Sequence, residues 1–159
     1  MRGVVLFSEA RVSGAYRRLE PMIMTMTLFL RIASVISLIF TLGHTAGGLR
    51  KWSPMGDNEV LKAMTTVRFD ASGANRSYLD FFMGFGWSIS VLMLMQTALL
   101  WHMASLARTD PAGMRPMIAV IALATIASGV IAWRFIFPVP ALFSAALVIA
   151  LVAAYFVGR

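Results

Sequence analysis

Long apolar runs separated by polar connections make up most of this chain. Four runs have the length needed to cross a bilayer, residues 25–46, 79–104, 116–137 and 141–157. About 20 apolar residues at a rise of about 1.5 Å each span a hydrocarbon core about 30 Å thick. None of the runs alternates strictly between polar and apolar residues, which disfavours a β-barrel and favours helices that close their own hydrogen bonds in lipid. The pattern predicts an all-α fold, a four-helix transmembrane bundle formed by one domain over residues 22–159.

The connection between the first two runs, residues 47–78, is longer than helix–helix connections usually are, so it is expected to contain structure of its own. Asp57 or Asn58 can cap a helix there. Apolar residues then recur at helical spacing, at Val60, Leu61, Met64 and Val67. The spacing predicts an amphipathic helix over residues 58–69 that lies at the membrane interface or caps the bundle.

Residues 1–21 are of mixed polarity, carry four arginines and contain no apolar core of the signal-peptide kind. We expect this stretch to be a polar arm that lies on the membrane or stays disordered, or to precede the true start of translation. Met1, Met22, Met24 and Met26 are the alternative starts.

Composition supports a membrane protein and removes several kinds of chemistry. Apolar residues make up 59% of the 159 positions and charged residues 13%, and a water-soluble domain of this size cannot bury so much apolar surface. The chain has no cysteine, which excludes disulfides, thiolate metal sites and cysteine nucleophiles. It also has no His-x-x-His, paired-carboxylate or nucleotide-binding motif, so the sequence implies no metal and no cofactor.

The net charge of +7 comes from 14 basic and 7 acidic residues. The basic residues flank the apolar runs, so we expect membrane lipids as partners and no nucleic acid. Four spans place eight of them on the side of the termini: Arg2, Arg11, Arg17, Arg18, Arg31, Arg108, Arg115 and Arg159. The other six lie on the opposite side: Arg50, Lys51, Lys62, Arg68, Arg76 and Arg134. The positive-inside rule therefore favours cytoplasmic termini by a narrow margin, and a start at Met22 reverses the preference.

Three ionisable residues are expected at one membrane face, because the first and third runs end there and the second begins there. They are His44, Asp80 and Arg134. Asp80 can orient the His44 ring, and Arg134 can hold an anion. The alternatives are a purely structural ion pair, separate exposure at the interface, and an interaction of Asp80 with the amino terminus of its own helix. Arg31, on the other side, is interpreted as a topology residue that reaches the interface.

Small residues stand among aromatic ones at two places. Gly84, Phe85 and Trp87 predict either tight helix packing or a flat, aromatic-walled slot for an isoprenoid, sterol or quinone tail. Gly43 and Gly47 form a small-xxx-small pair, which permits close approach of a second helix.

Three strings occur together: FTLGHTAGG at residues 40–48, DFFMGFGWS at 80–88 and WRFIFPVP at 133–140. With them the chain resembles a family of small bacterial four-span integral membrane proteins that have no established function. The resemblance covers about residues 28–144. It implies four helices in a bacterial inner (plasma) membrane, and it implies no catalytic residues.

Three functions fit these observations. The first is a binding or accessory protein that contacts lipid, a quinone or partner helices, as a homo-oligomer or beside a partner membrane subunit. The second is a membrane enzyme for a lipid-like or isoprenoid substrate, in which Asp80 and His44 exchange protons and Arg134 anchors an anionic headgroup. The third is a small oligomeric transporter.

Overall fold

The computed structural model describes residues 2–49, 53 and 55–157, and for residues 2–20 it describes the backbone alone. Three basic residues of the charge count lie outside the described residues: Arg50, Lys51 and Arg159. The chain divides into two compact units. The bundle unit comprises Met1–Ile36 and Thr97–Arg159, and the hairpin unit comprises Ser37–Gln96.

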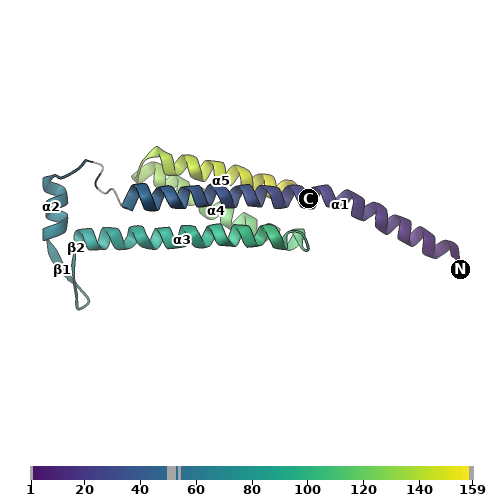
Figure 1. The fold of residues 1–159 in the computed structure, drawn as a ribbon, viewed down its shortest axis with the longest axis horizontal. Coiled ribbons are helices and arrows are strands. Elements are labelled where there is room, and N and C mark those ends of the chain that lie inside the picture. Colours follow the sequence, from purple (N-terminus) through teal and green to yellow (C-terminus); the bar gives the residue numbers. More distant parts are fainter. Residues whose placement is uncertain (1, 50–52, 54, 158–159) are drawn as a thin grey trace. The chain divides into compact units, whose positions relative to one another are not determined.

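Four long apolar helices dominate the structure: α1 (Arg2–Gly43), α3 (Tyr78–Leu106), α4 (Pro111–Phe135) and α5 (Pro138–Val157) (Figure 1). The segments long and apolar enough to cross a membrane are Pro21–Leu49, Tyr78–Leu106, Pro111–Phe135 and Pro138–Val157. The predicted all-α fold with four helices of transmembrane length is therefore confirmed. Because α1 begins at Arg2, the backbone of the stretch predicted as a polar arm is helical and continues into the first predicted span.

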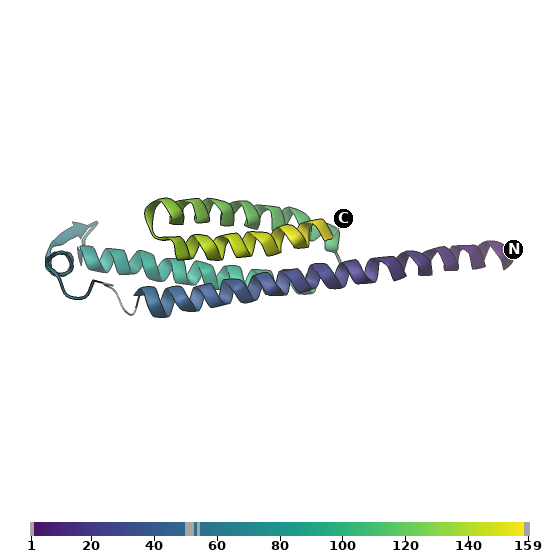
Figure 2. The ribbon, with the colours of Figure 1, turned by 90° about the horizontal axis from the view of Figure 1, so that it is seen from above.

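Within the bundle unit, α4 and α5 form a helical hairpin and lie side by side (Figures 1 and 2). Helix α4 begins at Pro111, five residues before the predicted start at Pro116. Asp110 caps it, because the Gly113 N–H donates to Asp110 Oδ1 at 2.8 Å. Pro111 then occupies the first helical position, where a proline loses no hydrogen bond.

The core of the bundle unit is built from aliphatic side chains and alanines. Each of α1, α3, α4 and α5 contributes to it, through Met26, Leu30, Ala33, Leu100, Met103, Ala104, Met114, Ile118, Ala122, Leu147, Ala150, Leu151 and Ala154. Larger apolar side chains on the same helices are exposed, among them Val120, Leu142 and Ile149. Apolar side chains therefore lie both in the core and on the outer faces of the helices, as expected of helices that pack against one another in lipid.

The hairpin unit contains the end of α1, a π-helical turn (His44–Leu49), α2 (Glu59–Thr66), strands β1 (Arg68–Ala71) and β2 (Ala74–Ser77), and the first part of α3. Asn58 caps α2, since the Leu61 N–H donates to its Oδ1 at 2.9 Å. The helix predicted between the first two spans therefore exists. The prediction that it extends to residue 69 is wrong, because α2 ends at Thr66 and Arg68 already pairs with Ser77 in a sheet.

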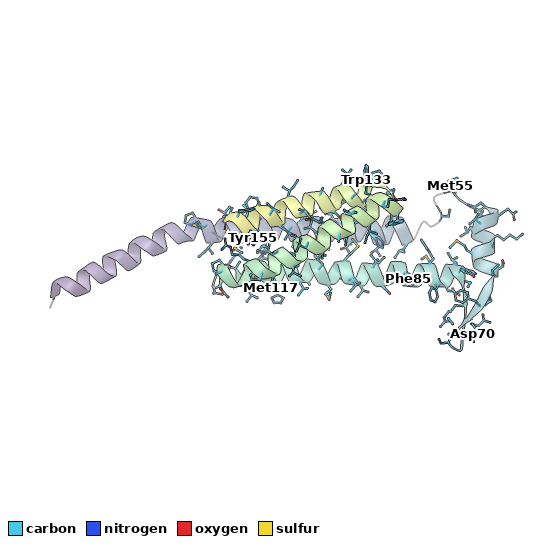
Figure 3. The ribbon with its side chains drawn as sticks, turned by 180° about the vertical axis from the view of Figure 1, so that it is seen from behind. Met55, Asp70, Phe85, Met117, Trp133 and Tyr155 are labelled. Atoms are coloured by element: carbon cyan, nitrogen blue, oxygen red, sulfur yellow. The ribbon has the colours of Figure 1, made fainter. Side chains whose placement is uncertain are left out.

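The two strands form an antiparallel hairpin with a two-residue turn. Ser72 and Gly73 occupy this turn with φ of 56° and 86°. Two successive residues with positive φ match the right-handed twist of a hairpin. Asp70, at the tip of the hairpin in Figure 3, accepts a hydrogen bond from the Gly73 N–H at 2.7 Å, which holds the turn.

Candidate functional site

A polar network lies between the end of α1 and the middle of α3, inside the hairpin unit. His44 Nδ1 is 3.1 Å from Ser90 Oγ, and Thr45 Oγ1 is 2.9 Å from the same hydroxyl. Ser90 is buried and His44 is half-buried. His44 stands at the first position of the π-helical turn, a departure from α-helix that often accompanies functional sites.

The network can hold its protons in two ways. Thr45 Oγ1 also lies 2.8 Å from the Thr41 carbonyl, so its single hydrogen goes either to Thr41 or to Ser90. When Thr45 donates to Ser90, the Ser90 hydroxyl donates to His44 Nδ1 and the ring proton is on Nε2. When Thr45 donates to Thr41, Nδ1 can donate to Ser90 instead. The hydroxyls therefore accommodate either tautomer of His44.

Asp80 stands at the third position of α3 and caps that helix. Its Oδ2 accepts from the Ser77 N–H at 2.8 Å, and its own N–H donates to Ser77 Oγ at 3.1 Å. This reciprocal pair is a capping box, in which two backbone donors at a helix start are satisfied by side chains. Arg68 approaches Asp80 Oδ2 at 4.0 Å with both side chains half exposed, so this ion pair contributes little. Asp80 therefore interacts with the amino terminus of its own helix, one of the alternatives drawn from the sequence.

We predict that Ser77→Ala lowers the free energy of unfolding by about 1 kcal/mol, the usual contribution of a serine cap. Asp80→Asn should cost less, because the amide oxygen still accepts from Ser77 and only the charge is lost. Denaturant unfolding in detergent micelles measures both. Equal losses for the two variants, or a larger loss for Asp80→Asn, would contradict the capping-box assignment.

The structure joins His44 to Ser90 and Asp80 to Ser77, and it records no hydrogen bond between His44 and Asp80 among the described residues. Ser90 follows Asp80 by ten residues on α3, a rise of about 15 Å along a helix. Arg134 belongs to the bundle unit, in the last turn of α4, with its guanidinium carbon 5.3 Å from the centroid of the Phe135 ring. The predicted cluster of all three residues spans both units and stays a prediction.

An aromatic row connects the hairpin to α3. The centroid of Phe69 lies 4.9 Å from that of Tyr78 and 5.5 Å from that of Phe81, and Phe81 lies 5.3 Å from Phe85. We call Phe69, Tyr78, Phe81 and Phe85 the aromatic row. Tyr78 is 54% exposed, Phe81 44% and Phe85 63%, although the rings contact one another. Figure 3 labels Phe85 on α3, and Trp87 two residues further along that helix is also exposed.

The glycines near this row differ in their surroundings. Gly86 is buried, and a Cβ added there would collide with the Leu49 side chain. A Cβ added at Gly84 would meet no atom within 4 Å, and the same holds at Gly43 and Gly47. Tight packing, one of the two interpretations of this string of glycines and aromatic residues, therefore occurs at Gly86, while the surface at Gly84 is open.

The described residues contain no group of three or more histidine, aspartate or glutamate side chains placed to hold a metal ion. In comparisons with known protein families, curated proteins and solved structures, no match to the chain was found. The resemblance to a family of four-span bacterial proteins thus stays a prediction.

Proposed function

We propose that this chain is a multi-pass protein of a bacterial inner membrane, with cytoplasmic termini, that serves as a binding or accessory protein. Its ligand is the apolar part of a membrane amphiphile, and the aromatic row together with Gly84 and Trp87 receives it. The observation that carries the proposal is the exposure of three rings of the aromatic row, Tyr78, Phe81 and Phe85, beside an open glycine. A quinone and a partner helix are the other apolar ligands that such a surface can take.

The charges around the row support an amphiphile. Arg68 and Arg76 are exposed on the two strands, and Tyr78 lies at the first position of α3. Aromatic and cationic residues at a helix end are typical of the interface between hydrocarbon and headgroups. An amphiphile there can place its chain on the rings and its polar group beside the arginines.

The test is native mass spectrometry of the full chain after gentle detergent extraction. We expect the wild type to retain lipid, and the double variant Phe81→Leu/Phe85→Leu to retain it several-fold less, because leucine keeps the apolar character and loses the flat ring face. Phe137→Leu is the matched control, since Phe137 is an exposed phenylalanine outside the row. A wild type that carries no lipid, quinone or protein would overturn the proposal. Equal retention by both variants would remove the aromatic row from it.

The enzyme and transporter alternatives stay predictions. The hydrogen bond between His44 and Ser90 pairs a base with a hydroxyl, as nucleophilic catalysis requires. Ser90 is buried, however, and it already interacts with both His44 and Thr45. The network is therefore explained more simply as packing between α1 and α3.

A further inference from the structure

A second polar contact joins α1 to α3 inside the bundle unit. Ser34 Oγ donates to the Thr97 carbonyl at 2.9 Å, and Arg31 Nη2 donates to Ser105 Oγ at 3.1 Å. The guanidinium carbon of Arg31 lies 3.4 Å from the centroid of the Trp101 ring, so the cation is stacked on an aromatic face. Earlier residues of α1 meet later residues of α3, so the two helices are antiparallel here.

Two polar atoms at this contact lack hydrogen-bond partners among the described residues. They are Arg31 Nη1 and Thr27 Oγ1, and both are buried. Thr27 is 8% exposed and precedes Arg31 by four residues, so both side chains lie on one face of α1. The antiparallel register places Thr27 level with Ser105. Buried donors without acceptors are costly, and they indicate that a group able to accept from them belongs at this point.

Among the described residues, no carboxylate forms an ion pair with Arg31. Over residues 21–36 and 97–157, the described side chains of the bundle unit include four arginines: Arg31, Arg108, Arg115 and Arg134. Asp110 is the one carboxylate residue in these ranges, and its side chain caps α4. The described residues of the bundle unit therefore supply no anionic acceptor for Arg31.

We propose that Arg31 and Thr27 form a binding site for an anionic oxygen group, the phosphate of a membrane amphiphile or free phosphate. The planar guanidinium presents donors that match phosphate oxygens, and Trp101 and Ser105 fix its orientation. Thr27 adds a hydroxyl donor one turn away. For a lipid phosphate the inference rests on the proposed function, and it adds a headgroup site distinct from the aromatic row.

The position of the site suits a headgroup. Ser105 is the penultimate residue of α3, which ends at Leu106, so Arg31 reaches the end of a segment long enough to cross a membrane. Tryptophan and arginine are both favoured where hydrocarbon meets headgroups. The interpretation of Arg31 as a topology residue explains its charge and its reach. It does not explain the two donors that have no acceptor.

The test measures lipid binding by the full chain in uncharged detergent, again by native mass spectrometry. The probes are dioleoylphosphatidylglycerol, a diacylglycerol with the same chains and no phosphate, and inorganic phosphate as a competitor. Arg31→Gln should weaken phosphatidylglycerol binding by about tenfold, because a charge-assisted hydrogen bond is lost. Thr27→Val, which keeps the shape and removes the hydroxyl, should weaken it by about threefold. The control Arg115→Gln removes an arginine that contacts Tyr155 instead of the proposed site, and it should bind like the wild type.

Competition with inorganic phosphate distinguishes a site for free phosphate from a site for a lipid headgroup. Competition by millimolar inorganic phosphate assigns the site to phosphate as such, and resistance to it assigns the site to the lipid headgroup; both results support the proposal. Phosphatidylglycerol binding that Arg31→Gln and Thr27→Val leave unchanged would overturn it. Should Arg31→Gln fail to fold, Thr27→Val alone decides. If diacylglycerol still binds and responds to Phe81→Leu/Phe85→Leu, the proposed function survives the loss of the headgroup site.

Discussion

Replacing Gly129 with leucine is expected to force α4 away from α5 and to lower the free energy of unfolding by about 2 kcal/mol, the usual cost of overpacking a core. Gly129 lies against Ser144 of α5, and a Cβ built on the glycine would stand 3.0 Å from the Ser144 Cβ. Even alanine is tight at this separation. The branched side chain of leucine has no space there without a shift of the backbone.

The matched control is Ala127→Leu, two residues earlier on α4 at an exposed position. It adds a similar volume on a face that meets lipid or detergent, so its effect should stay within about 0.5 kcal/mol. Reversible unfolding in mixed micelles, followed by circular dichroism, measures both variants. A Gly129→Leu protein as stable as Ala127→Leu would show that the two helices do not approach closely at this point.

The four long helices were predictable because their signal is a sum over about 20 residues. Hydrophobic length alone decides that a segment crosses the bilayer, whatever its individual contacts are. The helix ends were less predictable, because they depend on single side chains. Helix α4 begins at Pro111 because Asp110 caps it, whereas the apolar run itself begins near residue 116.

The β-hairpin was missed because its strands are short and mostly polar. Val67 continues the helical spacing of Val60, Leu61 and Met64, which extends the predicted helix beyond Thr66, where α2 ends. The sequence feature that indicates a hairpin turn is Ser72-Gly73. The two successive positive φ angles at these residues are known only from the structure. Tertiary contact of Phe69 with Tyr78 and Phe81 then favours the extended form.

Partners of the site residues were the least predictable. Counting spans assigns His44 and Asp80 to one end of the helices, but it cannot choose between a distant carboxylate and a nearby hydroxyl. A usable signal existed in α1 and the π-helical turn that follows it, where polar residues recur at heptad spacing at Thr27, Arg31, Ser34, Thr41 and Thr45. Small polar residues repeated in this way mark a helix face that packs against another helix in lipid. Ser34 and Thr45 do contact α3.

If these polar residues hold the two helices together, His44 and Ser90 should be energetically coupled. Ser90→Ala should lower the free energy of unfolding by about 1–3 kcal/mol, because it deprives a half-buried imidazole nitrogen of its partner. His44→Phe should cost less, since Ser90 still accepts from Thr45. Once the ring nitrogen is gone, the serine hydroxyl is no longer needed, so the double variant should be more stable than the sum of the two losses implies.

A double-mutant cycle measures that difference, and we expect a coupling of about 1 kcal/mol. Ser88→Ala is the matched control, because Ser88 lies on the same helix, is exposed and donates only to the Gly84 carbonyl of its own α3. Its effect should be near zero in both the wild type and the His44→Phe background. Strict additivity of Ser90→Ala and His44→Phe would mean that the hydrogen bond contributes nothing to packing. Any stabilisation from the network would then come from the hydrogen bond between Thr45 and Ser90, which Thr45→Val removes.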